Sequence, residues 1–179
     1  MRPPTLIVLC AAAAALSACG FHPLYGRING GPGAGQAFET VYIPPIELET
    51  AGYELRNALI DALRARSLPQ GALYDLKVIL RDRNQPIAIQ NQTVNGLKEV
   101  EITRYNYTLI ADYQLVERKS LKVLAKGTES SLSAYNVVTS PYATEVAYKE
   151  AQANTAKDLA EELRLRIGVY FSEHPVPGR

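Results

Sequence analysis

Near the middle of the chain, residues 103–116 have the sequence TRYNYTLIADYQLV. Successive side chains of a β-strand point to opposite faces. One face of this segment would carry only Tyr, Leu and Ala, at Tyr105, Tyr107, Leu109, Ala111, Tyr113 and Leu115. The other would carry Asn106, Thr108, Ile110, Asp112, Gln114 and Val116. The segment therefore predicts a long strand with two chemically different faces.

An antiparallel arrangement is predicted around this strand. Asn95-Gly96 separates two apolar stretches, 87–94 and 97–102, and this dipeptide is a strong hairpin signal because both turn positions require φ > 0. Residues 121–135 predict a partner strand on the other side, with Gly127 as a bulge or a point of close approach. Two further strands are predicted at 38–43 and 73–80.

Two helices complete the predicted fold. The first, 53–66, has Leu55, Leu59 and Leu63 at helical spacing. The second begins at Pro141 after the N-cap Ser140, and its apolar stripe extends to Tyr170. We expect an α+β fold in the order β-α-β-β-β-β-α. It would have a single mixed, mostly antiparallel sheet of four to five strands with both helices on one face. The other face would carry Tyr, Thr, Ser and charged side chains.

The first residues predict an exported protein. Arg2 is followed by an unbroken apolar run, 6–16, which is too short for a permanent membrane span and fits a cleaved signal segment. Leu16-Ser17-Ala18-Cys19 resembles the lipobox of bacterial lipoproteins, in which the Cys receives diacylglycerol, the chain is cut before it and the new amine is acylated. The alternatives are an ordinary cleavage point near Cys19, or an uncleaved anchor at 6–16.

Four segments follow from this interpretation. Residues 1–18 would be the signal peptide, 19–37 a lipidated, flexible tether, 38–172 the folded domain, and 173–179 a Pro-containing tail. Gly20 follows the Cys where an Asp would signal retention in the inner membrane. We therefore expect a lipid anchor in the outer membrane, with the covalent N-acyl and S-diacylglycerol groups on Cys19 in place of any cofactor.

The composition makes several kinds of chemistry improbable. The chain of 179 residues has 19 Lys and Arg against 18 Asp and Glu, which lacks the basic excess of a nucleic-acid-binding protein. Its two His residues, His22 and His174, lack metal-ligand spacing. Glu99 and Glu101 alternate onto one strand face but have no pocket signature, and solvated surface is the simpler interpretation. We expect a protein that is neither an enzyme nor a metal binder.

Several motifs together resemble one known family. Residues 19–26, CGFHPLYG, resemble the start of the mature lipopolysaccharide-assembly lipoproteins of the LptE family in its alphaproteobacterial form. Further similar motifs are 103–105, 111–115, 126–128, 131–137 and 142–143. The resemblance implies a non-enzymatic, outer-membrane lipoprotein that faces the periplasm, with two helices on a four-stranded sheet. It implies that the protein plugs the β-barrel LptD, helps that barrel to assemble, and takes part in lipopolysaccharide transport to the surface.

Lipopolysaccharide carries phosphates, so a binding site needs Lys or Arg. The candidates are Arg104, Lys122 and Lys126, with Arg81 and Arg83 behind them; both lysine numbers are even, which would place the two on one strand face. The alternative is that these are solvated positions that guard an edge against pairing.

The aromatic composition fits a polar contact surface. The 11 Tyr, 3 Phe and absence of Trp suit a plug in a polar lumen, unless the tyrosines are half-buried strand residues. The alternative function is a stand-alone periplasmic lipoprotein that binds lipid or peptidoglycan.

Overall fold

The computed structural model describes the backbone of residues 34–94 and 97–174, and the side chains of 35–88 and 102–174. The described elements are α2 (Ala34–Phe38), β1 (Val41–Tyr42), α3 (Glu49–Leu63), β2 (Tyr74–Val94), β3 (Leu97–Glu117), β4 (Val123–Asn136) and α4 (Pro141–Glu173). The strands form one sheet in the order β1-β2-β3-β4. β1 is parallel to β2, and the other pairs are antiparallel. The expected mixed, mostly antiparallel sheet with two long helices is confirmed.

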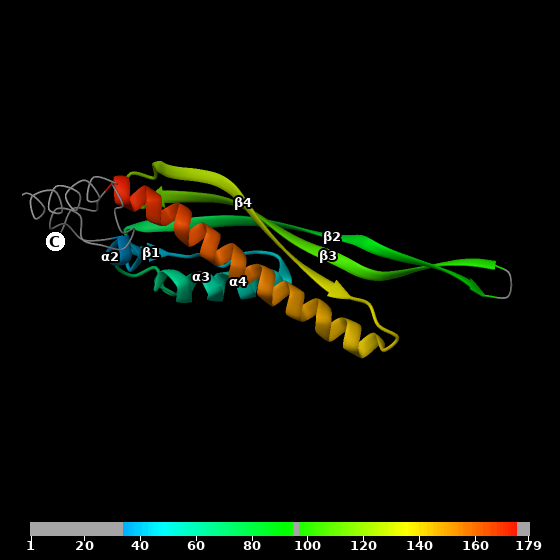
Figure 1. Cartoon of the computed structure of the whole chain (residues 1–179). Coiled ribbons are helices and arrows are strands. Elements are labelled where there is room, and N and C mark those ends of the chain that lie inside the picture. The colour runs from blue at the N-terminus through cyan, green and yellow to red at the C-terminus, as the bar shows by residue number, and fades with distance from the viewer. Residues whose placement is uncertain (1–33, 95–96, 175–179) are drawn as a thin grey trace, which may run out of the picture.

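Both long helices, α3 and α4, cover the same face of the sheet (Figure 1). From Tyr105 to Leu115 the odd-numbered side chains of β3 point toward them, and Tyr107, Leu109, Ala111 and Leu115 are fully buried. The helices contribute the other half of this core through Leu55, Leu59, Leu63, Ala156, Leu159, Leu163 and Ile167. The alternation in 103–116 therefore selects the core face, and burial of these apolar side chains stabilises the fold.

β2 and β3 form one long hairpin. Each is a strand of 21 residues, about 70 Å in length, and Val94 pairs with Leu97. The four separate segments expected at 73–80, 87–94, 97–102 and 103–116 are therefore two continuous strands. β4 pairs with β3 only between Arg104 and Val116, so the rest of the hairpin projects beyond the helices as a two-stranded ribbon (Figure 1). The turn Asn95-Gly96 itself lies outside the described residues.

The N-terminal part of the domain differs from the prediction. The strand expected at 38–43 is only Val41–Tyr42, because the preceding residues form α2 and bury Ala37 and Phe38 against the end of α4. Four residues expected in the tether, 34–37, are thus helical. Pro44-Pro45 follows β1 closely, as predicted for a strand stop.

The start of one long helix agrees with the prediction, and the start of the other does not. α4 begins as predicted: Ser140 Oγ accepts a hydrogen bond from the Ala143 N–H at 3.4 Å, and Pro141 occupies the first turn. α3 begins at Glu49, earlier than the predicted Tyr53, since its first turn contains Gly52 and lacks an apolar repeat. None of the described helices is both long and apolar enough to cross a lipid bilayer.

Candidate functional site: the open face of the sheet

The face of the sheet opposite α3 and α4, which we call the open face, carries most of the basic side chains of the strands. The even-numbered residues of β3 from Arg104 to Val116 lie on it, together with their partners on β2 and β4. Five exposed cations share this face: Lys77, Arg81, Arg83, Arg104 and Lys126. The register places two carboxylates there, Asp75 and Asp112. Such a surface favours anionic groups.

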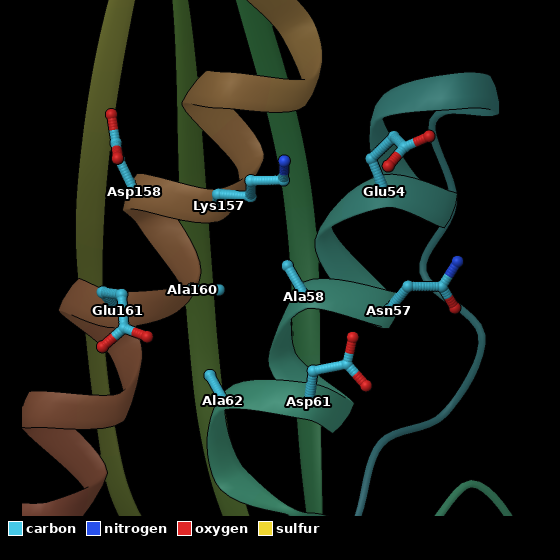
Figure 2. Close-up of a pocket in the computed structure, with 9 residues that line it drawn as sticks. All are labelled: Glu54, Asn57, Ala58, Asp61, Ala62, Lys157, Asp158, Ala160 and Glu161. Atoms are coloured by element: carbon cyan, nitrogen blue, oxygen red, sulfur yellow. The ribbon is translucent and has the colours of Figure 1, made fainter.

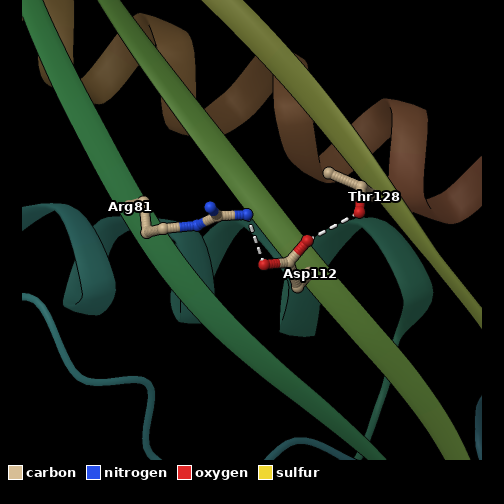
Figure 3. Close-up of polar contacts among 3 residues, drawn as sticks. All are labelled: Arg81, Asp112 and Thr128. Carbon is tan, nitrogen blue, oxygen red and sulfur yellow. Dashed lines mark hydrogen bonds and ion pairs between the residues drawn. The ribbon is translucent and has the colours of Figure 1, made fainter.

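Arg81, Asp112 and Thr128 connect three strands across the open face (Figure 3). Arg81 Nη2 lies 2.5 Å from Asp112 Oδ2, and Thr128 Oγ1 donates to Asp112 Oδ1 at 2.6 Å. The Thr128 hydrogen bond and then the Arg81 charge lower the pKa of Asp112 below its ordinary value. One carboxylate oxygen of Asp112 thus holds the Arg81 guanidinium, and the other accepts from Thr128.

The structure places Arg104 and Lys126 on the same face but far apart. Arg104 pairs with Asn136, whereas Lys126 pairs with Gln114, ten positions further along β3. This separation is about 34 Å along the strand. The nearer partner of Lys126 is Lys77, because both flank Gln114 from opposite sides at about 10 Å between outer strands. The sequence analysis did not single out Lys77, although strand alternation from Arg81 would have found it.

Lys122 does not share the open face with Lys126. It lies before β4, in the β3–β4 turn, and its carbonyl accepts a hydrogen bond from the Glu117 N–H at 2.9 Å. The pairing shifts by one residue, with Val116 opposite Val123 and Leu115 opposite Ala125. This irregularity reverses the alternation, so the argument from even numbering is wrong for Lys122.

The tyrosines lie mainly on the helix side, which corrects the expectation that Tyr would characterise the other face. Tyr107, Tyr113 and Tyr135 are buried, and Tyr148 of α4 packs on Tyr107 and Tyr135 with ring centroids 5.6 and 5.4 Å apart. Hydroxyls at the edge of this cluster find partners: Asn84 Nδ2 donates to Tyr135 Oη at 2.8 Å. The large ring area of Tyr fills the space between α4 and the sheet.

The remaining residues of interest are widely separated or outside the described part. The His174 ring stacks on Tyr170 at 4.5 Å between centroids, at the end of α4. Cys19 and His22 lie outside the described residues, as do the side chains of Glu99 and Glu101.

A hollow between α3 and α4 has the opposite charge to the open face (Figure 2). Its floor consists of small residues, which let the helices approach, and its rim carries four carboxylates and one Lys. The lining residues are Glu54, Asn57, Ala58, Asp61, Ala62, Lys157, Asp158, Ala160 and Glu161. This hollow therefore disfavours anionic ligands, and the open face is the better candidate for binding them.

Comparisons with known proteins agree with this architecture. A family model described as LptE, lipopolysaccharide-assembly, matches residues 38–167. The protein RP188 of Rickettsia prowazekii (strain Madrid E) is 28% identical over 168 residues, which is 93% of this chain and 95% of RP188. The crystal structure of a lipoprotein from Caulobacter crescentus CB15 superposes with a TM-score of 0.60 at 19% identity, and covers 78% of this chain and 96% of that chain. The match to the Caulobacter protein shows a shared fold.

Proposed function

The chain belongs to the LptE family of lipopolysaccharide-assembly proteins, and from this premise we propose that it is a lipid-anchored outer-membrane protein that works with the β-barrel LptD. In this role it plugs the barrel, helps it to assemble, and takes part in moving lipopolysaccharide to the cell surface. The observation that carries the proposal is the family match from Phe38 to Ile167, which includes every strand and most of α4.

The chemistry of the surface supports a plug. The lumen of a membrane β-barrel is polar, and this protein presents charged side chains on both sides of its core. Cations predominate on the open face, and carboxylates predominate around the hollow between α3 and α4. Such a molecule can fill a polar lumen through hydrogen bonds and ion pairs without burying a large apolar patch.

The open face also supports direct contact with lipopolysaccharide phosphates. Arg104 and Lys126 remain our candidates from the sequence, and Lys77 and Arg83 extend the same surface. Arg presents a planar set of donors that suits phosphate, and Lys supplies a point charge. The spacing of these cations along about 34 Å of strand suits an extended ligand better than a single phosphate group.

The proposed location depends on lipidation of Cys19. We propose S-diacylglycerol and N-acyl groups at this residue, and a location in the periplasmic leaflet of the outer membrane. Two or more acyl chains give stable anchoring, whereas one chain is marginal. The proposed role requires no catalytic residue, metal or cofactor.

Two experiments test the function. The Cys19→Ala chain should accumulate unprocessed or in the wrong compartment and should not incorporate labelled palmitate; labelling of that variant would contradict the lipobox assignment. Tagged wild-type protein should co-purify in detergent with a large β-barrel, in a complex whose mass equals the sum of the two proteins. Recovery only as a free lipoprotein would contradict the plug role and favour a stand-alone binding protein.

The lipopolysaccharide contact needs its own comparison. Arg104→Glu combined with Lys126→Glu should weaken lipopolysaccharide binding by at least roughly tenfold, since charge-assisted hydrogen bonds contribute about 1.5–3 kcal/mol each. Lys157→Glu, on the helix side, is the matched control and should bind normally. If both variants bind lipopolysaccharide equally well, the open face is not the lipopolysaccharide-binding surface.

A further inference from the structure

One end of the domain exposes large apolar side chains among cations. The β3–β4 turn carries Leu121, whose side chain is 78% exposed, next to Arg118, Lys119 and Lys122. The loop after α3 carries Leu68, which is 65% exposed, and Leu73, which is 38% exposed. We call these six residues, Leu68, Leu73, Arg118, Lys119, Leu121 and Lys122, the base surface.

Hydrogen bonds join the two segments of the base surface. The Arg118 N–H donates to the Leu73 carbonyl at 2.9 Å, and the Arg118 guanidinium donates to the Pro69 carbonyl. The turn is closed by the Leu121 N–H, which donates to the Glu117 carbonyl at 2.8 Å. The apolar and basic side chains are therefore held on one continuous part of the molecule.

Leu121 has an unfavourable conformation for its residue type. Its φ is +58°, in the left-handed region where Gly and Asn are common and other residues cost roughly 1 kcal/mol. Neither the backbone nor packing in the folded domain favours a Leu here, because the side chain contacts mainly solvent. A strained, exposed apolar residue indicates a contact outside the domain.

Two of the three charges of the base surface, those of Lys119 and Lys122, are available to a partner. Arg118 is paired with Asp75 at 3.2 Å, but Lys119 and Lys122 form no ion pair with the side chains described, those of 35–88 and 102–174. The nearby carboxylate of Glu117 accepts a hydrogen bond from Ser120. The turn is thus net positive, which is the sign that anionic phospholipid headgroups attract.

The base surface lies where the chain enters the domain. The Thr40 carbonyl, just after α2, accepts a hydrogen bond from the Leu73 N–H at 2.8 Å. Figure 1 shows α2 and the end of α4 at the end of the molecule opposite the tip of the β2–β3 hairpin. Cys19 precedes Ala34 by 15 residues, which can span at most about 54 Å. A lipid on Cys19 therefore tethers this end of the domain.

We propose that the base surface rests on the membrane, with Leu68, Leu73 and Leu121 among the headgroups and Lys119 and Lys122 at the phosphates of anionic phospholipids. This second contact would fix how the domain is oriented on its anchor. The inference rests on the proposed lipidation of Cys19.

The test uses the lipidated mature protein, residues 19–179, in vesicles of phosphatidylethanolamine and phosphatidylglycerol that contain a headgroup-depth spin-label quencher. Cys19 would be blocked by lipid and Cys10 removed with the signal peptide, so an introduced Cys is the only free thiol. A fluorophore on Leu121→Cys should be quenched at least twofold. The matched control is Leu132→Cys, a 57% exposed position on the open face, where the fluorophore should not be quenched.

Charge reversal and lipid composition complete the test. Lys119→Glu with Lys122→Glu should reduce quenching at position 121, with a weakening of roughly fivefold per lysine for anionic membranes. Vesicles of phosphatidylcholine alone should have the same effect. If the protein is lipidated and the label at position 121 is not quenched, the proposed membrane contact of the base surface is wrong, but lipidation stands. If the label is shielded in native envelopes but not in lipid vesicles, the base surface contacts a protein, and the proposed membrane contact is again wrong. A parent chain that takes up the dye at Cys19 refutes lipidation and this inference together.

Discussion

The ring of Tyr113 lies against Gly127, its direct partner on the neighbouring strand. A Cβ at Gly127 would lie 3.0 Å from both Cε1 and Oη of Tyr113, closer than carbon atoms pack without strain. The strand pairing continues in register through Gly127. Of the two possibilities that the sequence raised for this glycine, close approach is therefore correct and a bulge is not.

Gly127→Ala should lower the free energy of unfolding by about 1–2 kcal/mol, because the added methyl group must displace the Tyr113 ring. Urea denaturation followed by circular dichroism measures this change. Gly35→Ala in α2 is the matched control, since no atom lies within 4 Å of its added Cβ. Combining Gly127→Ala with Tyr113→Leu should cost less than the sum of the two single changes; strict additivity would show that the ring is not the obstacle.

The sequence predicted the two faces of β3 and a sheet with both helices on one face, but it did not predict that the tyrosines lie on the helix side. The alternation in 103–116 is a local property of the sequence, and it correctly separates the residues of the buried face from those of the open face. The placement of Tyr105 and Tyr107 depends on where α4 packs, which is a long-range property. The prediction also divided β2, because the polar stretch from Arg81 to Pro86 interrupts the apolar pattern. Pairing with β3 keeps it a strand, and Pro86 is tolerated because β1 pairs only with Tyr74 and Asp75, which leaves that edge of β2 free.

The candidate site, like the fold, could be predicted only in part. Arg104 and Lys126 were chosen for their charge, and only the register shows that both lie on the open face. Lys122 was misplaced because the shift between Val116 and Leu115 is invisible in the sequence. The distance between Arg104 and Lys126 could not be predicted without knowing which residues of β3 and β4 are partners.

Gly52→Ala should lower the free energy of unfolding by more than about 2 kcal/mol, and therefore by more than Gly127→Ala does. The added Cβ would lie 2.4 Å from the Ile46 carbonyl oxygen, and backbone cannot rotate away as a side chain can. The same movement would break the bond from the Gly52 N–H to the Leu48 carbonyl, 2.8 Å. Urea denaturation of both variants checks the order, and a smaller effect at Gly52 would show that the 44–48 loop is free to move.

Asp112→Asn should change how stability depends on pH. The pKa of Asp112 is lowered from 3.8 by the Thr128 hydrogen bond and then by Arg81. The charged carboxylate therefore contributes its full stabilisation at pH values above the pKa that Asp112 has in the unfolded chain. That effect is lost as pH falls through the folded pKa. Wild type should therefore be more stable than the variant at pH 6, and the difference should shrink below about pH 4. Unfolding free energies between pH 3 and pH 7 measure it; a difference independent of pH would contradict this account. Thr128→Val should reproduce part of the change.

Tyr107→Phe should leave stability unchanged or raise it, by up to about 1 kcal/mol. The Tyr107 side chain is fully buried, and its hydroxyl forms no hydrogen bond among the described residues; the Gln152 amide donates to Tyr148 Oη instead, at 3.1 Å. Burial accordingly raises the pKa of Tyr107. Tyr135→Phe is the matched comparison, because it loses the bond from Asn84 and should cost roughly 0.5–1 kcal/mol. Thermal unfolding of the two variants separates them. If Tyr107→Phe were the more destabilising, its hydroxyl would have a partner in solution, and a water held between α4 and β3 would be the first candidate.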